Sequence, residues 1–97
     1  MNIDQFKECF DKFDKESHKF DRIENKLSRR PDLHAFILLD KLIPSDFDII
    51  SAAEHDEIYL DGNLEVLASV ATEDDIRDLI RCGVMLNESS ECLYMFA

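Results

Sequence analysis

Residues 57–96 read EIYLDGNLEVLASVATEDDIRDLIRCGVMLNESSECLYMF, and this stretch decides the fold class. The run EIYL, followed by the turn pair Asp61-Gly62, is typical of a strand that ends in a tight turn. Two apolar runs, residues 84–86 and 92–96, flank a polar turn and predict a C-terminal β-hairpin. Together these segments predict a three-stranded sheet, antiparallel or mixed. The alternative is a mostly helical protein in which EIYL pairs with nothing.

Two short helices separate the predicted strand from the hairpin. Asn63 and Thr72 are placed to cap them, because their side-chain oxygens can accept free amide groups of a first helical turn. Gly83 ends the second helix. The apolar stripes of the two helices are Leu64, Leu67, Ala68 and Ala71 in the first, and Ile76, Leu79 and Ile80 in the second. Helices beside a small sheet define an α+β fold, with the helices packed on one face of the sheet.

Upstream, residues 31–42 predict a further helix with Pro31 in its first turn. Its side chains are apolar almost all round, so we expect it to be the most buried helix of the fold. Pro44 ends it. The following sequence, Ser45 to Asp48, resembles a capping box and predicts a short helix that continues to about Glu54.

At the N-terminus, apolar residues from Ile3 to Leu27 follow a pattern of alternating three- and four-residue steps, with Ser17 and Glu24 filling the gaps in register, which predicts one long amphipathic helix. As a straight helix it would be roughly 37 Å long, whereas a chain of this size has a radius of gyration of only about 12–13 Å. One end would overhang and expose Phe6, Phe10 and Phe13. We expect two such helices to pair in a homodimer. The alternative is a break near Ser17-His18, with both halves folded onto the body.

The chain length of 97 residues supports one hydrophobic core. We therefore predict a single domain over residues 1–97, made of the long helix (1–29) and an acidic α+β body (30–97).

The charge is strongly and unevenly negative. The net charge is −11, and after residue 31 fifteen Asp and Glu face only three Lys and Arg. Such a field repels nucleic acid and anionic membranes, so we expect neither to be bound directly. Solubility needs a net charge of only about 2–8 in magnitude. The excess therefore predicts a basic protein partner, since opposite charge speeds the encounter.

One acidic cluster is the predicted partner-binding site: Glu73, Asp74, Asp75 and Asp78. These residues cluster on one short predicted helix. The competing explanation is helix capping and compensation of the helix dipole, which account for Thr72 to Asp75 without any partner.

The histidines and cysteines predict neither a metal site nor a catalytic one. His18, His34, His55, Cys9, Cys82 and Cys92 show no CxxC, i,i+3 or i,i+4 pair. The residues around His55 favour a solvated turn over a proton-transfer site. We predict reduced thiols in a cytosolic protein, no cofactor, no enzymatic activity, and no secretion signal or membrane span.

Parts of the chain resemble small acidic uncharacterised proteins of bacteriophages and prophages. The resemblance is carried by residues 30–40, 49–60, 72–76 and 80–84 and covers about residues 30–97. It implies a protein made in an infected bacterium, in the host cytoplasm. It also implies an inhibitor of host machinery, in the manner of anti-CRISPR proteins or nucleic-acid mimics. The alternative is an immunity or antitoxin protein that neutralises a basic toxin, and a small enzyme is a third possibility.

Overall fold

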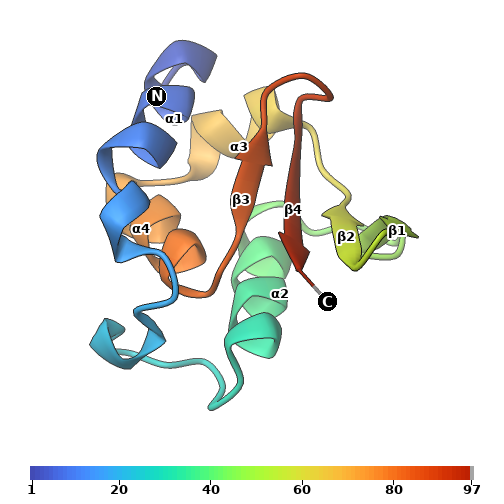
Figure 1. The fold of residues 1–97 in the computed structure, drawn as a ribbon. Coiled ribbons are helices and arrows are strands. Elements are labelled where there is room, and N and C mark those ends of the chain that lie inside the picture. Colours follow the sequence, from blue (N-terminus) through green and yellow to red (C-terminus); the bar gives the residue numbers. More distant parts are fainter. Residues whose placement is uncertain (97) are drawn as a thin grey trace.

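The protein is an α+β fold in which four strands form one antiparallel sheet in the order β1-β2-β4-β3 (Figure 1). The computed structural model describes residues 1–96. Its elements are α1 (Ile3–Lys12), the 3-10 turns η1 (Asp14–Glu16) and η2 (Phe20–Arg22), α2 (Pro31–Leu42), β1 (Ile50–Glu54), β2 (Glu57–Leu60), α3 (Leu64–Val70), α4 (Glu73–Arg81), β3 (Met85–Asn87) and β4 (Cys92–Phe96).

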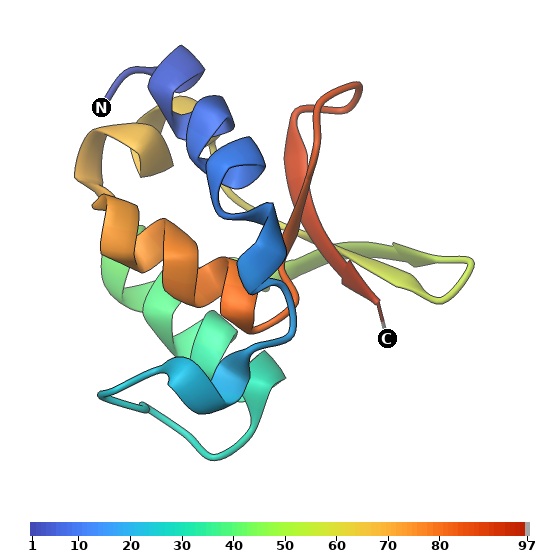
Figure 2. The same ribbon diagram turned by 60° about the vertical axis from the view of Figure 1, so that its left-hand side comes forward.

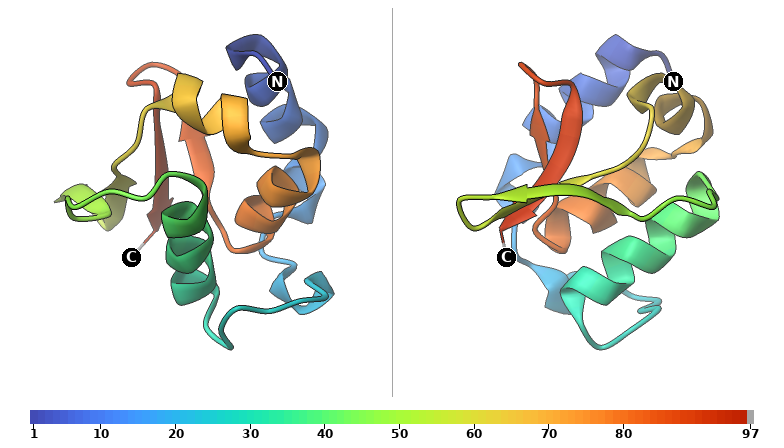
Figure 3. Two further views of the ribbon diagram at one scale, coloured as in Figure 1. Left: turned by 180° about the vertical axis from the view of Figure 1, so that it is seen from behind. Right: turned by 90° about the vertical axis from the view of Figure 1, so that its right-hand side faces the viewer.

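The sheet has one covered face and one open face. Alternate residues of a strand point to opposite faces, so the buried Leu60, Leu93 and Met95 mark the face that meets the core. Figure 2 shows the helices on that side and the sheet on the other, with the β1–β2 hairpin projecting from the body. In Figure 3, the view from behind, α2 and α3 lie in front of the strands. The expectation that the helices pack on one face is confirmed.

The C-terminal half follows its local sequence signals. The strand at residues 57–60, both short helices and the C-terminal hairpin lie where they were predicted. Asn63 Oδ1 accepts the amide of Glu65 at 2.9 Å, and Thr72 exchanges reciprocal hydrogen bonds with Asp75. The mostly helical alternative is wrong, because β2 pairs with both β1 and β4.

The predicted short helix between Ser45 and Glu54 is wrong. Ser45 Oγ accepts the amide of Phe47 at 3.1 Å, two residues ahead, and closes a turn in place of a capping box. Residues 50–54 form β1, so the sheet has four strands where three were predicted. A short apolar run can form either a helix or a strand, and here pairing with β2 favours the strand.

The single helix over residues 3–27 is also wrong. Helix α1 ends at Lys12, and the chain then makes two 3-10 turns, with His18 in the left-handed region at φ 61°. A straight helix of that length would exceed the largest dimension of the molecule, 28 Å. The curved path instead allows Ile23 to be buried, at 3% exposure. Burying a large side chain contributes about 1.5–3 kcal/mol, more than one helical hydrogen bond.

The phenylalanine stripe predicted to form a dimer lies inside the monomer. Phe6, Phe10 and Phe13 are all buried, with exposed fractions of 0%, 9% and 7%. The guanidinium of Arg77 lies 4.4 Å from the centre of the Phe13 ring and covers it. Helix α1 ends at Lys12, so the length mismatch that suggested a dimer disappears. The alternative in which the N-terminal segment breaks and folds onto the body describes the structure better.

Helix α2 is less buried than predicted. His34, Ala35 and Leu39 are its buried residues, while Leu33 is 44% exposed. Part of the apolar surface of α2 therefore lies outside the core. The C-terminal end of this helix lines a groove.

Candidate functional site

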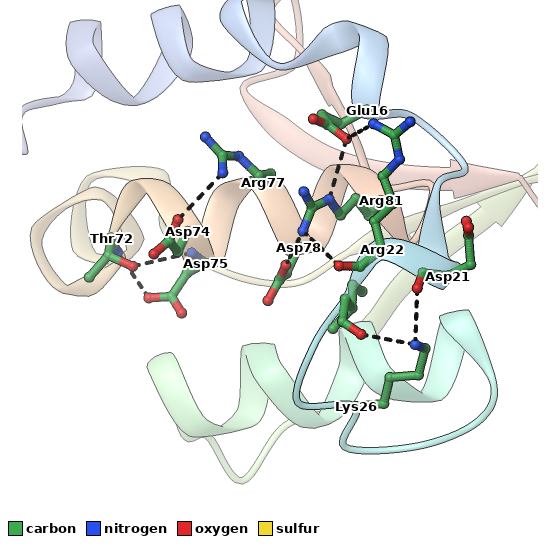
Figure 4. A network of polar contacts seen from close by, with 11 residues as sticks. Glu16, Asp21, Arg22, Lys26, Thr72, Asp74, Asp75, Arg77, Asp78 and Arg81 are labelled. Atoms are coloured by element: carbon green, nitrogen blue, oxygen red, sulfur yellow. Dashed lines mark hydrogen bonds and ion pairs between the residues drawn. The ribbon is translucent and has the colours of Figure 1, made fainter.

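The four acids predicted to contact a partner each have a partner within the chain, and Figure 4 shows three of them, Asp74, Asp75 and Asp78. Glu73 lies 3.6 Å from Lys12, and Asp74 lies 3.8 Å from Arg77. The Asp75 carboxylate accepts the backbone amide of Thr72 at 2.9 Å. The structure does place the four acids on one helix, α4, but each has a structural partner within the chain.

Asp78, the fourth of these acids, belongs to a cluster centred on Arg81. The Arg81 guanidinium lies 3.4 Å from both Asp78 and Glu16, and it donates to the backbone carbonyl of Arg22. These contacts tie α4 to the curved N-terminal segment (Figure 4). Burial raises the pKa of the Asp78 carboxyl, and the positive charge of Arg81 acts in the opposite direction. The cluster stabilises the fold and offers little free charge to a partner.

A long segment of unpaired negative charge with few cations lies elsewhere, on residues 40–65. This segment contains a single Lys or Arg, Lys41. Among the described residues, none of its eight carboxylates is within ion-pair distance of a Lys or Arg. They are Asp40, Asp46, Asp48, Glu54, Asp56, Glu57, Asp61 and Glu65. The segment includes the end of α2, the following loop, the projecting hairpin and the start of α3.

Three of these carboxylates border an apolar groove of about 460 Å³. Asp40, Asp48 and Asp61 line it beside apolar side chains from three parts of the chain. The apolar lining includes Leu39, Ile43, Pro44, Phe47, Ile49 and Val66. Phe47 is 80% exposed and Val66 is 50% exposed, which is unusual for large apolar residues. The structure thus joins a free apolar surface to free negative charge, and we call this site the acidic groove.

The acidic groove is shaped by a close approach between two loops. The amide of Asp61 donates to the carbonyl of Ile49 at 2.6 Å. This hydrogen bond links the residue before β1 to the residue after β2. Gly62 has φ +144°, and a Cβ there would lie 2.6 Å from Cδ1 of Ile43. Only glycine combines this backbone conformation with this contact. Ile43 therefore packs directly on the backbone that leads into α3.

Comparisons of the chain with protein-family models, curated proteins and solved structures return no match.

The cysteines and histidines are dispersed. Burial raises the pKa of Cys9 and raises the pKa of Cys82 to about 12, which keeps both as thiols at neutral pH. His55 and Asp56 form the two-residue turn between β1 and β2, as their sequence context indicated. His34 is buried against Phe20. Within residues 1–96, no three His, Cys, Asp or Glu side chains are grouped so that they could hold a metal ion.

Sequence reasoning missed the acidic groove because it assigned its loop to a helix. The available signal was Phe47, a large aromatic residue between two aspartates directly after Pro44 and Ser45. A turn-forming context leaves such a side chain without a local apolar neighbour.

None of the helices in the described part of the chain has the length and apolar character to cross a membrane.

Proposed function

We propose that this protein is a non-enzymatic binding protein that docks a basic, amphipathic segment of another protein in the acidic groove. The observation that carries the proposal is the combination of exposed Phe47 with three unpaired carboxylates around one groove. In the phage setting implied by the sequence resemblance, the partner is a basic host protein or a subunit of a defence complex. The protein acts there as an inhibitor, by occupying a surface that otherwise binds nucleic acid.

The two kinds of residue in the groove have different tasks. Covering Phe47 and Val66 removes apolar surface from water, and each large side chain contributes about 1.5–3 kcal/mol. The carboxylates of Asp40, Asp48 and Asp61 favour partners with Lys or Arg beside the apolar anchor, and they accelerate the encounter. Charge alone would bind any cation, whereas the apolar groove adds a requirement for shape.

The test uses a synthetic amphipathic helix of leucine and lysine as the probe, with binding measured by calorimetry. We expect Phe47→Ser to weaken binding about tenfold, because a well-seated aromatic anchor is worth about 1.4 kcal/mol or more. The triple change Asp40→Asn, Asp48→Asn and Asp61→Asn should weaken binding and flatten its dependence on salt between about 0.05 and 0.5 M.

The matched control removes the same charge from exposed acids outside the groove: Asp4→Asn, Asp21→Asn and Glu24→Gln. Equal losses in the two triple variants would show that only net charge matters and would refute the groove. Affinity that does not change with salt would refute the electrostatic part. The natural partner, isolated by pull-down and identified by mass spectrometry, separates the two biological settings. A defence-complex subunit supports inhibition of host machinery, and a single basic toxin supports the immunity protein instead.

A further inference from the structure

A second surface, the open face of the sheet, presents aromatic rings and carboxylates together. The strand register places Ala52, Tyr59, Tyr94 and Met85 in one row across the four strands. The next row on the same face contains Glu54, Glu57 and Phe96. The core residues Leu60, Leu93 and Met95 point to the opposite side. We call these two rows the open face, and in Figure 1 no helix crosses in front of strands β3 and β4.

The rings of the open face form a continuous strip. The Tyr59 and Tyr94 ring centres lie 6.3 Å apart, and those of Tyr94 and Phe96 lie 6.2 Å apart. Phe96 is 59% exposed. The Tyr59 hydroxyl donates to a carboxylate oxygen of Glu57 at 2.7 Å, which fixes that carboxylate beside the rings. Such a strip can accept a flat cation by cation–π contact while a carboxylate neutralises its charge.

The hairpin carries a like-charge pair that lacks a strong cation. Glu54 and Glu57 are directly opposite each other across β1 and β2. Such a pair destabilises a hairpin when nothing neutralises it. The basic side chain found near Glu54 within residues 1–96 is that of His55 at 3.3 Å, and it is 88% exposed. A cation held between the two glutamates would remove the repulsion.

The edge of the sheet next to these glutamates is free. Strand β1 is an edge strand, and all five of its residues are exposed. Ala52, beside Tyr59 in the same row, has a side chain too small to cover that ring from the edge. An extended segment that pairs with β1 could therefore reach over Ala52 to the aromatic strip with a long side chain.

We propose that the open face binds an extended, arginine-bearing segment of a partner protein, which adds to the edge of β1. Its arginine side chains lie over Tyr59 and Phe96 and pair with Glu54 and Glu57. Arginine fits better than lysine because its planar guanidinium stacks on rings and pairs with a carboxylate at the same time. The carboxylates disfavour a nucleic-acid strand on the same rings. A second copy of this chain is disfavoured too, because it brings a net charge of −11 and its own glutamates.

This surface shares no residue with the acidic groove, so it extends the proposed function and can fail independently of it. The probe is a decapeptide of alternating arginine and threonine, titrated while backbone amide and aromatic ring signals are followed by NMR. We expect shifts at the amides of β1 and at the Tyr59, Tyr94 and Phe96 rings. Phe96→Leu should weaken binding about fivefold by removing a cation–π contact, and Glu57→Gln should weaken it by a similar factor.

The controls are Phe47→Ser, which changes the groove, and Glu65→Gln, which removes the same charge from α3. Both should leave the decapeptide affinity unchanged. The proposal is overturned by equal binding of a lysine-threonine decapeptide, by equal losses in Glu57→Gln and Glu65→Gln, or by shifts that map to the groove. Binding of single-stranded DNA to the rings, or self-association through β1 without peptide, would also overturn it. Loss of decapeptide binding alone would leave the groove proposal standing.

Discussion

The backbone amide of Leu27 donates a hydrogen bond of 3.0 Å to Nδ1 of His34, so the buried imidazole holds the end of the irregular N-terminal segment. His34 is 2% exposed, and its other ring nitrogen is buried without a partner among residues 1–96. The neutral ring suits this site. A protonated ring would lose the acceptor that Leu27 uses and would place a charge in the core.

This contact predicts that stability falls below about pH 6.5. Burial lowers the pKa of His34, while the negative charge of Asp78 acts in the opposite direction. As the pH falls, the unfolded chain takes up the proton first, near its ordinary pKa of about 6.5. The stability is therefore full above that pH and is lost as the pH falls through the folded pKa, by at most about 1.4 kcal/mol per pH unit. Chemical denaturation at about pH 7.5 and 5.5 measures the change.

The control for this prediction is His34→Gln, which keeps an acceptor for Leu27 but does not titrate. Burial raises the pKa of Asp78, which therefore favours the folded state on protonation, and His34 acts on that pKa in the opposite direction. The difference between the two pH profiles therefore reports His34 together with its interaction with Asp78. Parallel profiles would contradict the prediction.

A second prediction concerns Phe10→Asp. Because Phe10 is only 9% exposed, the aspartate would put a charge into the core and leave a cavity. We expect a loss of at least about 3 kcal/mol of unfolding free energy, which leaves much of the chain unfolded. Val70→Asp, at a residue that is 47% exposed, should cost less than about 1 kcal/mol. A folded Phe10→Asp monomer derived from a wild-type dimer, seen by sedimentation equilibrium, would restore the dimer interpretation.

A third prediction separates the two roles of Gly62. Gly62→Ala should destabilise the protein by about 1–3 kcal/mol, because alanine is strained at φ +144° and its Cβ would meet Ile43. Adding Ile43→Ala removes the clash but not the strain. We expect the double variant to lose less stability than the sum of the two single variants, as measured by denaturation. Strict additivity would show that the contact with Ile43 is unimportant.

A fourth prediction concerns the turn of the projecting hairpin. His55 and Asp56 have φ values of 50° and 64°, a conformation that Asn-Gly adopts at lower cost in two-residue hairpins. The double change His55→Asn and Asp56→Gly should stabilise the hairpin by about 1 kcal/mol. Hydrogen exchange at the β1 amides should then slow about fivefold. Unchanged or faster exchange would contradict this, and the amides of α4 serve as the internal reference.

The sequence predicted elements well where the signal and the structure it specifies lie within a few residues. Helices α3 and α4 follow from Asn63 and Thr72, because a cap is satisfied by amides two or three residues ahead. The C-terminal hairpin follows from two apolar runs around one polar turn. Each of these decisions is local, so no other part of the chain can easily reverse it.

The predictions were wrong where contacts with residues distant in the sequence overrode a local sequence pattern. Ser45 to Asp48 fits a helix start, yet β2 pairs with residues 50–54 and makes them a strand. Residues 3–27 keep a helical period, yet burial of Ile23 requires the chain to curve round the body. The groove around Phe47 was missed for the same reason, since its walls come from α2, α3 and the two loops that join these helices to the β1–β2 hairpin.

The sequence by itself determined the α+β class, the helix starts at Ile3, Pro31, Leu64 and Glu73, and the large excess of negative charge. Caps and periodicity are properties of short segments, and net charge is a sum over the composition, so none of them depends on the fold. The tertiary structure alone decided which carboxylates are free. Lys12, Arg77 and Arg81 neutralise acids on α4 that lie close in space, whereas within residues 1–96 the carboxylates from Asp40 to Glu65 form no ion pair with a Lys or Arg. Coulomb interactions depend on distance in space, and only the folded chain sets those distances.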